Sequence, residues 1–87
     1  MSTALDTIRG AYLAAVRARL DADAAVVAAA VAYRRAERDC PDVLPARQEA
    51  WRAACRARIR AANAEQTALH AYERELYAAT YGHEGRP

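Results

Sequence analysis

The sequence contains no lysine and no phenylalanine, and among its 87 residues it has only three glycines, three prolines and two cysteines. All thirteen basic residues are therefore arginines, yet the formal net charge is only +2. So small a charge does not by itself indicate a nucleic-acid-binding protein. Because glycine and proline are so scarce, most of the chain is free to lie in long uninterrupted elements.

The two cysteines give no sign of a metal site or a disulfide framework. Cys40 and Cys55 show neither a CxxC motif nor the spacing of zinc ligands, and His70 and His83 are not grouped with them. We therefore expect two reduced thiols, no metal and no cofactor.

Long hydrophobic runs are also missing. The longest, Ala24 to Tyr33, has ten residues, whereas a helix needs about 20 apolar residues to cross a bilayer. The first residues do not show the pattern of a signal peptide. The sequence therefore predicts a cytoplasmic protein without a membrane span.

Large aliphatic side chains are few, with six leucines, five valines and two isoleucines, and much of the 54% hydrophobic content is alanine. Alanine has the highest helix propensity but buries little area. A small domain with so thin a core is marginal alone, and oligomerisation is a common remedy. We expect a single all-helical domain over residues 1–87 that forms a homodimer.

The helix breakers are concentrated at two places, a central turn and the end of the chain. The residue before a proline is pushed out of the α region, so a helix must stop before Pro41, and Pro45 suits the first turn of the next helix. Asn63 to Gln66 is the weakest part of the second half. The sequence thus predicts a helix over 3–39, a turn over 40–45, helices over 46–63 and 65–80 (or one long helix) and a tail over 81–87.

Each long stretch carries an apolar stripe at helical spacing. In the first it comprises Leu5, Ile8, Tyr12, Val16, Leu20, Val27 and Val31. In the second it comprises Trp51, Cys55, Ile59, Ala62, Leu69, Tyr72 and Leu76. A first helix of this length would extend about 55 Å, which predicts an extended hairpin or an interlocked dimer.

The segment Val31-Ala32-Tyr33-Arg34-Arg35, the turn and Pro45-Ala46-Arg47-Gln48-Glu49 resembles the centre of the all-helical, AroQ-type chorismate mutases. That family has a lysine, then proline six residues on, proline at ten, arginine at twelve and glutamate at thirteen. Counted from Arg35, this chain matches the two prolines and the arginine and has Gln48 at the last position. The resemblance implies an interlocked helical homodimer that rearranges chorismate.

The resemblance also implies roles for particular residues. Arg35 takes the place of the lysine that contacts a carboxylate and the ether oxygen, and Gln48 lies near the ring hydroxyl. Glu84 falls where the family has a side chain beside the ether oxygen. Arg47 and Arg9 would bind substrate, Arg9 from the partner chain. Guanidinium groups suit the two carboxylates of chorismate, and a pericyclic step needs positioning and charge stabilisation but no cofactor.

Three family positions differ in this chain: the loop aspartate is Leu44, the mid-helix arginine falls on Ala24, and the first-helix arginine falls on Thr7, two residues from Arg9. An active mutase, a relative that binds another dicarboxylate and an inactive regulator all stay open. The alternative is an antiparallel helical hairpin whose apolar stripes bind a partner helix, as an adaptor, a secretion substrate or a phage structural component. A break near Asn63 would favour the mutase fold, and an unbroken second helix the hairpin.

Arg52, Arg56 and Arg60 recur every four residues and so line one face of the second helix. The pattern is typical of a solvated face and also fits an anion-contacting surface. Glu65 and Glu73 follow on the same helix. They interrupt a continuous basic track, so nucleic acid is not the favoured partner.

Overall fold

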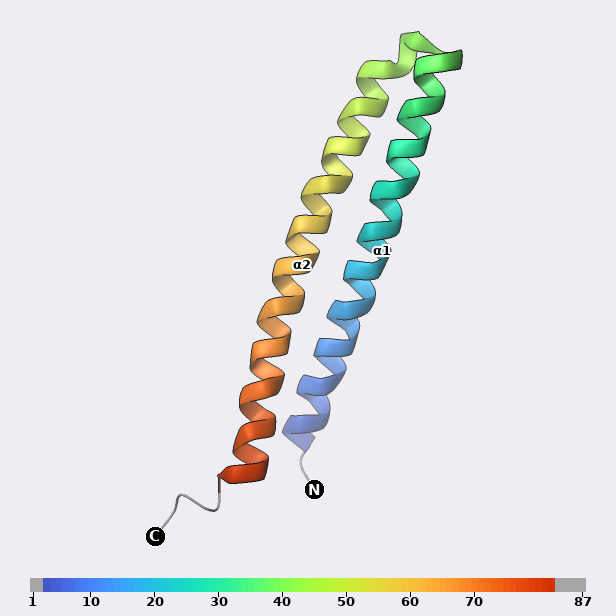
Figure 1. Cartoon of the computed structure of the whole chain (residues 1–87). Helices are drawn as coiled ribbons and strands as arrows, with labels where there is room; N and C mark the ends of the chain where they lie inside the picture. The colour runs from blue at the N-terminus through green and yellow to red at the C-terminus, as the bar shows by residue number, and fades with distance from the viewer. Residues whose placement is uncertain (1–2, 83–87) are drawn as a thin grey trace.

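The computed structural model describes residues 3–82, which form two long helices joined by a tight turn (Figure 1). Helix α1 spans Thr3–Asp39, the short 3-10 helix η1 spans Pro41–Val43, and helix α2 spans Leu44–Tyr81. The described residues include no strand. The helices run antiparallel, so the hairpin has a turn end and an open end, where α1 begins and α2 ends. The predicted all-α class with one proline-bearing turn is confirmed.

The turn follows from its two prolines. Cys40 precedes Pro41 and leaves the helical region, with φ −145° and ψ 71°, as the residue before a proline prefers to do. Pro45 lies in the first turn of α2, where its missing N–H removes no hydrogen bond. The compact η1 lets α2 begin at Leu44, two residues before the predicted start at 46.

The course of α2 differs from the prediction in two places. The predicted division between 46–63 and 65–80 is wrong, because α2 continues unbroken through Asn63. Its carbonyl oxygen accepts a hydrogen bond of 3.1 Å from the Thr67 hydroxyl one turn later, and alanines on both sides of it favour the helix. At the far end α2 includes Tyr81, which was predicted to begin the tail. Residues 83–87 lie outside the described part of the chain.

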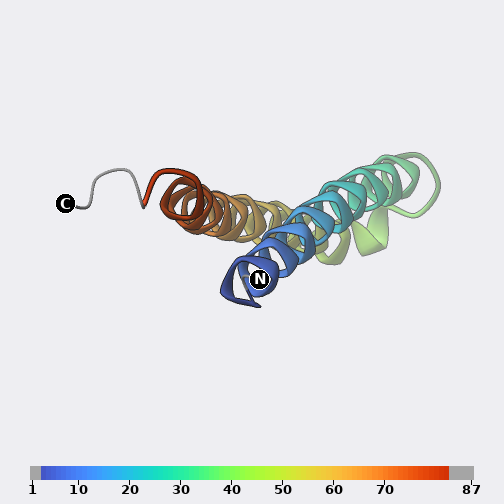
Figure 2. The ribbon, with the colours of Figure 1, turned by 90° about the horizontal axis from the view of Figure 1, so that it is seen from below.

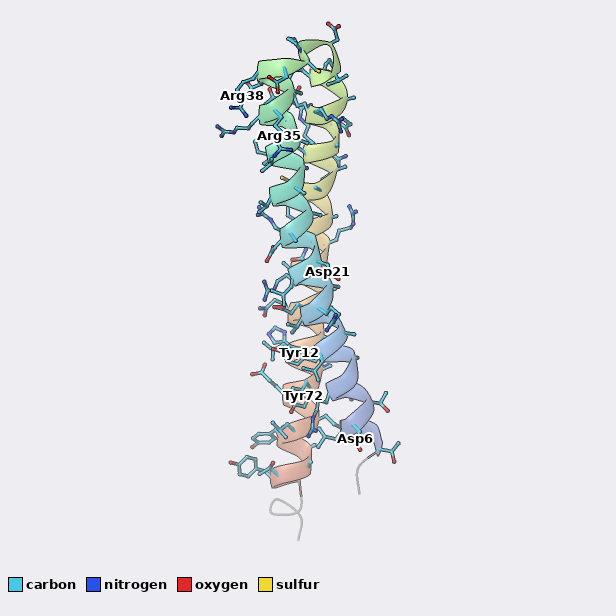
Figure 3. The ribbon with its side chains drawn as sticks, turned by 90° about the vertical axis from the view of Figure 1, so that its right-hand side faces the viewer. Asp6, Tyr12, Asp21, Arg35, Arg38 and Tyr72 are labelled. Atoms are coloured by element: carbon cyan, nitrogen blue, oxygen red, sulfur yellow. The ribbon has the colours of Figure 1, made fainter. Side chains whose placement is uncertain are left out.

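The helices meet along a seam with a seven-residue repeat. Its contacts pair Tyr12 with Tyr72 (ring centroids 5.7 Å apart), Arg19 with Glu65 (2.6 Å) and Tyr33 with Trp51 (5.4 Å). Successive pairs are separated by seven or fourteen residues on both helices and run in opposite directions. This is the register of an antiparallel coiled coil. Figure 3 shows the first of these pairs, Tyr12 and Tyr72, at neighbouring positions on the two helices.

Between these large pairs the seam consists mostly of alanine. The alanines that are partly or fully buried at seam spacing are Ala15, Ala22, Ala29 and Ala36 of α1 and Ala54, Ala61 and Ala68 of α2. Small residues at a contact allow two helix axes to come close together. They also bury little area, so the seam aligns the helices without forming a large core.

The hairpin is consequently flat and has almost no interior. Its Cα atoms extend over 70 × 18 × 12 Å, and viewed along its length it is a single layer of two inclined helices (Figure 2). Among the described residues only Val26 and Ala36 are buried hydrophobic side chains. One hairpin therefore leaves most of its apolar side chains in contact with solvent.

Candidate functional site

The two predicted apolar stripes do not coincide with the seam between the helices. Tyr12 lies in the seam, but Leu20 is 54% exposed and Val27 is 63% exposed. On α2, Trp51 packs against α1 whereas Ile59 is 58% exposed. A helix turns about 100° per residue, so side chains one position away from the seam point to a different side of the hairpin. Because the seam is mostly alanine, the large side chains of the seam and those of the exposed side combine in the sequence into one apparent stripe.

The outward-facing large side chains define what we call the aliphatic face. On α1 it comprises Leu13, Val16, Leu20, Val27, Ala30 and Val31. On α2 it comprises Cys55, Ile59, Ala62, Leu69 and Leu76. Leu13, Leu20 and Val27 are spaced by seven residues, as the seam residues are, but one position later. Each helix therefore presents two contact stripes, which is typical of a helix that lies between two neighbours.

Both stripes lie on the same side of the hairpin. Trp51 borders a groove that contains Val27 and Ala30 of α1. It also borders a second groove that contains Arg52 and Cys55 of α2. Because one indole touches both grooves, the α1 and α2 stripes form one continuous surface, and shallow grooves continue along it on each helix.

The opposite side, which we call the alanine face, carries mainly methyl groups. It comprises Ala11, Ala18, Ala25 and Ala28 of α1 and Ala50, Ala57, Ala64 and Ala71 of α2. No large hydrophobic side chain of α1 lies on it, since the exposed ones all belong to the aliphatic face. The two sides of the hairpin thus differ in the apolar area that a partner could remove from water. Association through the aliphatic face would gain more free energy than association through the alanine face.

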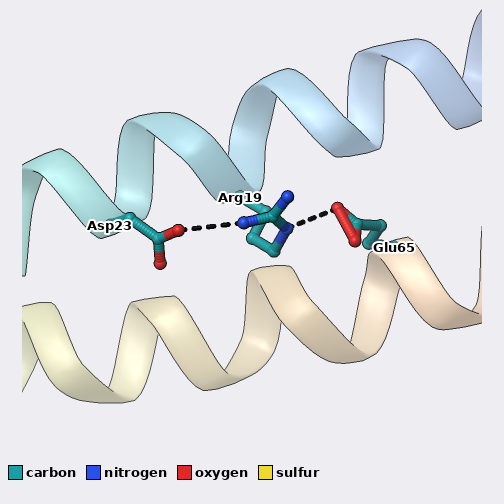
Figure 4. Close-up of polar contacts among 3 residues, drawn as sticks. All are labelled: Arg19, Asp23 and Glu65. Carbon is teal, nitrogen blue, oxygen red and sulfur yellow. Dashed lines mark hydrogen bonds and ion pairs between the residues drawn. The ribbon is translucent and has the colours of Figure 1, made fainter.

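The centre of the seam holds a polar layer that sequence reasoning missed. Arg19 donates from Nε to Glu65 at 2.6 Å and from Nη1 to Asp23 at 2.9 Å (Figure 4). The hydrogen bond to Glu65, followed by its negative charge, raises the pKa of Arg19 above its ordinary value. A pair of opposite charges at one level of the seam favours this register of the two helices. The sequence does contain a signal for this layer, because Arg19 and Glu65 carry opposite charges at equivalent positions of the seven-residue repeats of α1 and α2.

Arg35 and Arg47, two residues to which the resemblance gives substrate roles, lie in one pocket at the turn end. The pocket has a volume of about 360 Å³ and is lined by Ala32, Ala36, Cys40 and Val43 as well as by the two arginines. Asp39 also lines it, so one carboxylate already stands near the guanidinium groups. The structure thus brings together an arginine from each helix above an apolar floor.

The other predicted site residues are not part of this pocket. Gln48 lines the groove beside Trp51 on the aliphatic face. Arg9 is exposed on α1 near the open end, about 39 Å along the helix from Arg35. Glu84 lies outside the described residues. Of the four predicted residues that the structure describes, Arg35 and Arg47 therefore share a site within one chain, and Gln48 and Arg9 do not.

The three arginines at four-residue spacing on α2 do not form a free basic track. Arg56 donates to Glu49 at 2.9 Å in a pair whose side chains are 56% and 62% exposed. Exposed pairs of this kind contribute little to stability. Arg52 and Arg56 both line the groove beside Trp51, so they border the aliphatic face at the turn end.

Both cysteines are free thiols, with Cys40 exposed and Cys55 half-buried. The described residues hold no group of three or more His, Cys, Asp or Glu side chains placed to bind a metal ion. Neither helix of the described chain has a stretch long and apolar enough to cross a membrane.

Comparison with known proteins adds no relative to these observations. The chain matches no family model, no curated protein and no solved structure.

Proposed function

We propose that this chain is a helical protein-interaction module that completes its hydrophobic core by packing its aliphatic face on another helical surface. The observation that carries the proposal is the burial pattern. Among residues 3–82 only Val26 and Ala36 are buried hydrophobic side chains, while six large hydrophobic residues of the aliphatic face are exposed. An amphipathic helix surface of this kind is a recognised means of binding another helix. The unbroken α2 also favours the hairpin over the mutase-like arrangement.

The burial pattern predicts that the free energy of unfolding depends on association. We expect the thermal midpoint, followed by circular dichroism, to rise as the protein concentration is raised from low micromolar to millimolar, because binding to the folded state stabilises it by mass action. A monomer that unfolds without a cooperative transition also fits the proposal, with the missing surface on another protein. A monomer that unfolds cooperatively at one midpoint at all concentrations would contradict it.

A second candidate function is carried by the pocket at the turn end. Arg35 and Arg47 approach it from different helices above an apolar floor, an arrangement suited to a small dicarboxylate. On this second proposal the chain binds or rearranges chorismate or a related dicarboxylate, as the resemblance of this segment implies. Asp39, at the same pocket, would have to turn away from the anion.

Under the second proposal, purified protein depletes chorismate, and Arg35→Ala or Arg47→Ala lowers the rate at least about 100-fold, because each removes a charge-assisted contact to a carboxylate. The loss of chorismate absorbance measures the rate. Arg60→Ala, which removes an exposed arginine outside the pocket, is the matched control and should retain the rate. Unchanged chorismate absorbance at high protein concentration would exclude the mutase activity and leave the interaction module unaffected.

A further inference from the structure

We infer that a second copy of this chain covers the aliphatic face, with its turn end against the open end of the first copy. The two α1 helices then pack antiparallel with Leu20 at the two-fold axis, and the two α2 helices pack antiparallel beside them. The result is a four-helix bundle in which every neighbouring pair of helices is antiparallel. This inference rests on the proposed interaction function and specifies its partner.

The exposed area fits a partner of the same size. The chain exposes 6609 Å² at a mass of 9.5 kDa, whereas a compact folded protein of that mass exposes about 5,000 Å². If each of two copies covered this excess of about 1,600 Å², the total buried area would be about 3,000 Å², within the range of obligate homodimers. A second copy exposes the same excess of surface area, so a single interface between two copies would cover the excess of both.

The spacing of side chains on α1 is self-complementary about Leu20. A two-fold axis through this residue places it opposite itself and places Leu13 opposite Val27 of the second copy, because each lies seven residues away. Asp6 and Arg34 lie fourteen residues from Leu20 on either side, on the same stripe. The axis brings the carboxylate of one copy to the guanidinium of the other. Such reciprocal pairing is what an interface between two identical surfaces requires.

The α2 stripe points to nearly the same axis. Arg52 near the turn end and Glu73 near the open end occupy equivalent positions of its repeat, and their midpoint falls at Ala62 and Asn63. In the seam register set by the two aromatic pairs, this midpoint lies level with Asp21 and Ala22, one to two residues from Leu20. A single two-fold axis near Leu20 therefore suits both helices and sets Ala62 close to Asn63 of the second copy.

Charge favours this orientation over the other way of stacking two hairpins. Arg34 and Arg52 border the aliphatic face near the turn end, and Asp6 and Glu73 border it near the open end. Glu37 and Arg9, seven residues from Ala30 and Val16, carry the opposite charges at those ends. Figure 3 shows the same polarity, with Arg35 and Arg38 near the turn and Asp6 near the open end. Two copies with their turns together would place basic end on basic end and acidic end on acidic end. Turning one copy around replaces both repulsions with attraction.

The test is thiol cross-linking in a full-length chain with Cys40→Ser and Cys55→Ser. Leu20→Cys should give a disulfide-linked dimer on mild oxidation with diamide, because the new thiol faces its own copy across the axis. Ala28→Cys, on the alanine face of the same helix, is the matched control and should stay uncross-linked. Mixing Leu13→Cys with Val27→Cys chains should give a linked pair that neither forms alone.

Charge reversal supplies a second readout that does not depend on new thiols. Asp6→Arg and Arg34→Asp should each weaken the dimer roughly tenfold, since two exposed pairs are lost and replaced by repulsion, and the double variant should restore it. Sedimentation equilibrium measures the dimer. A dimer in which Leu20→Cys links only to a Gln66→Cys chain, as turns placed together would require, overturns this arrangement and leaves the proposed function standing. If the protein is still a monomer at millimolar concentration, the partner is not a second copy. The proposed function then fails as well only if that monomer unfolds cooperatively at the same midpoint at all concentrations.

Discussion

Leu20→Glu is expected to dissociate the proposed dimer while leaving each hairpin helical. The side chain is 54% exposed in the single hairpin, so its loss removes little from the seam. At the two-fold axis two copies of it are buried together, and burying a fully exposed leucine contributes about 1.5–3 kcal/mol. Because only about half of each side chain is newly covered, losing both costs about 1.5–3 kcal/mol, which corresponds to a dimer weaker by about 10- to 100-fold. The repulsion of two facing carboxylates adds to this.

The matched control is Ala28→Glu, which places the same charge on the alanine face of the same helix. It should keep the dimer constant of the unaltered chain, because exposed positions outside an interface change free energies by less than about 0.5 kcal/mol. Sedimentation equilibrium and the helical circular dichroism signal at low concentration check both expectations. If both variants weaken association equally, the interface lies elsewhere. If Leu20→Glu unfolds the monomer, Leu20 belongs to the core of the hairpin.

The elements were predictable because strong local signals determine them. The prolines at 41 and 45 act on their immediate neighbours, so the end of α1 could be read from the chain. The continuity of α2 could not be read in the same way. Asn63 is a weak helix former by propensity, but contacts across the seam on either side of it hold α2 in place. Tertiary packing overrides a local preference of this size.

The side of each helix that faces its neighbour was harder to predict than the helices themselves. Leu20 and Tyr12 both fit a stripe at helical spacing, yet one is exposed and the other lies in the seam. Large side chains are the usual marker of a core stripe. Here the seam between large pairs is alanine, which carries almost no hydrophobic signal. The better marker would have been the seven-residue spacing shared by Tyr12, Arg19 and Tyr33.

Two residues to which the resemblance gives substrate roles lie together because both are close to the turn. Arg35 and Arg47 are joined by a short segment, and any tight turn between antiparallel helices brings such positions close together. Arg9 lies at the other end of a straight helix, so only a second chain could bring it there. The antiparallel dimer inferred above does not do so, because it covers the aliphatic face, whereas Ala32 and Arg35 of the pocket lie seven residues after Ala25 and Ala28 of the alanine face.

The alanine seam itself leads to the second large expected effect. Ala61→Leu is expected to destabilise the hairpin, although leucine is more hydrophobic and nearly as good a helix former. The seam register places Ala61 level with Ala22, both partly buried, and one turn before Glu65. Additional methylene groups at a close contact push the helices apart and strain the 2.6 Å bond between Arg19 and Glu65. Overpacking of this kind costs about 1–3 kcal/mol, a large fraction of the stability of a small domain.

Urea unfolding followed by Trp51 fluorescence measures this effect, because the indole packs against Tyr33 in the same seam. Ala64→Leu, an exposed position one turn away on the alanine face, controls for the added hydrophobicity and should shift the unfolding midpoint little. A higher midpoint for Ala61→Leu would mean that the seam has room for a larger side chain. The helices would then be held apart by the aromatic pairs rather than drawn together at alanine. A lower midpoint for Ala61→Leu alone would mean that the chain uses alanine to align two helices closely, so that its large aliphatic side chains stay available for the second hairpin.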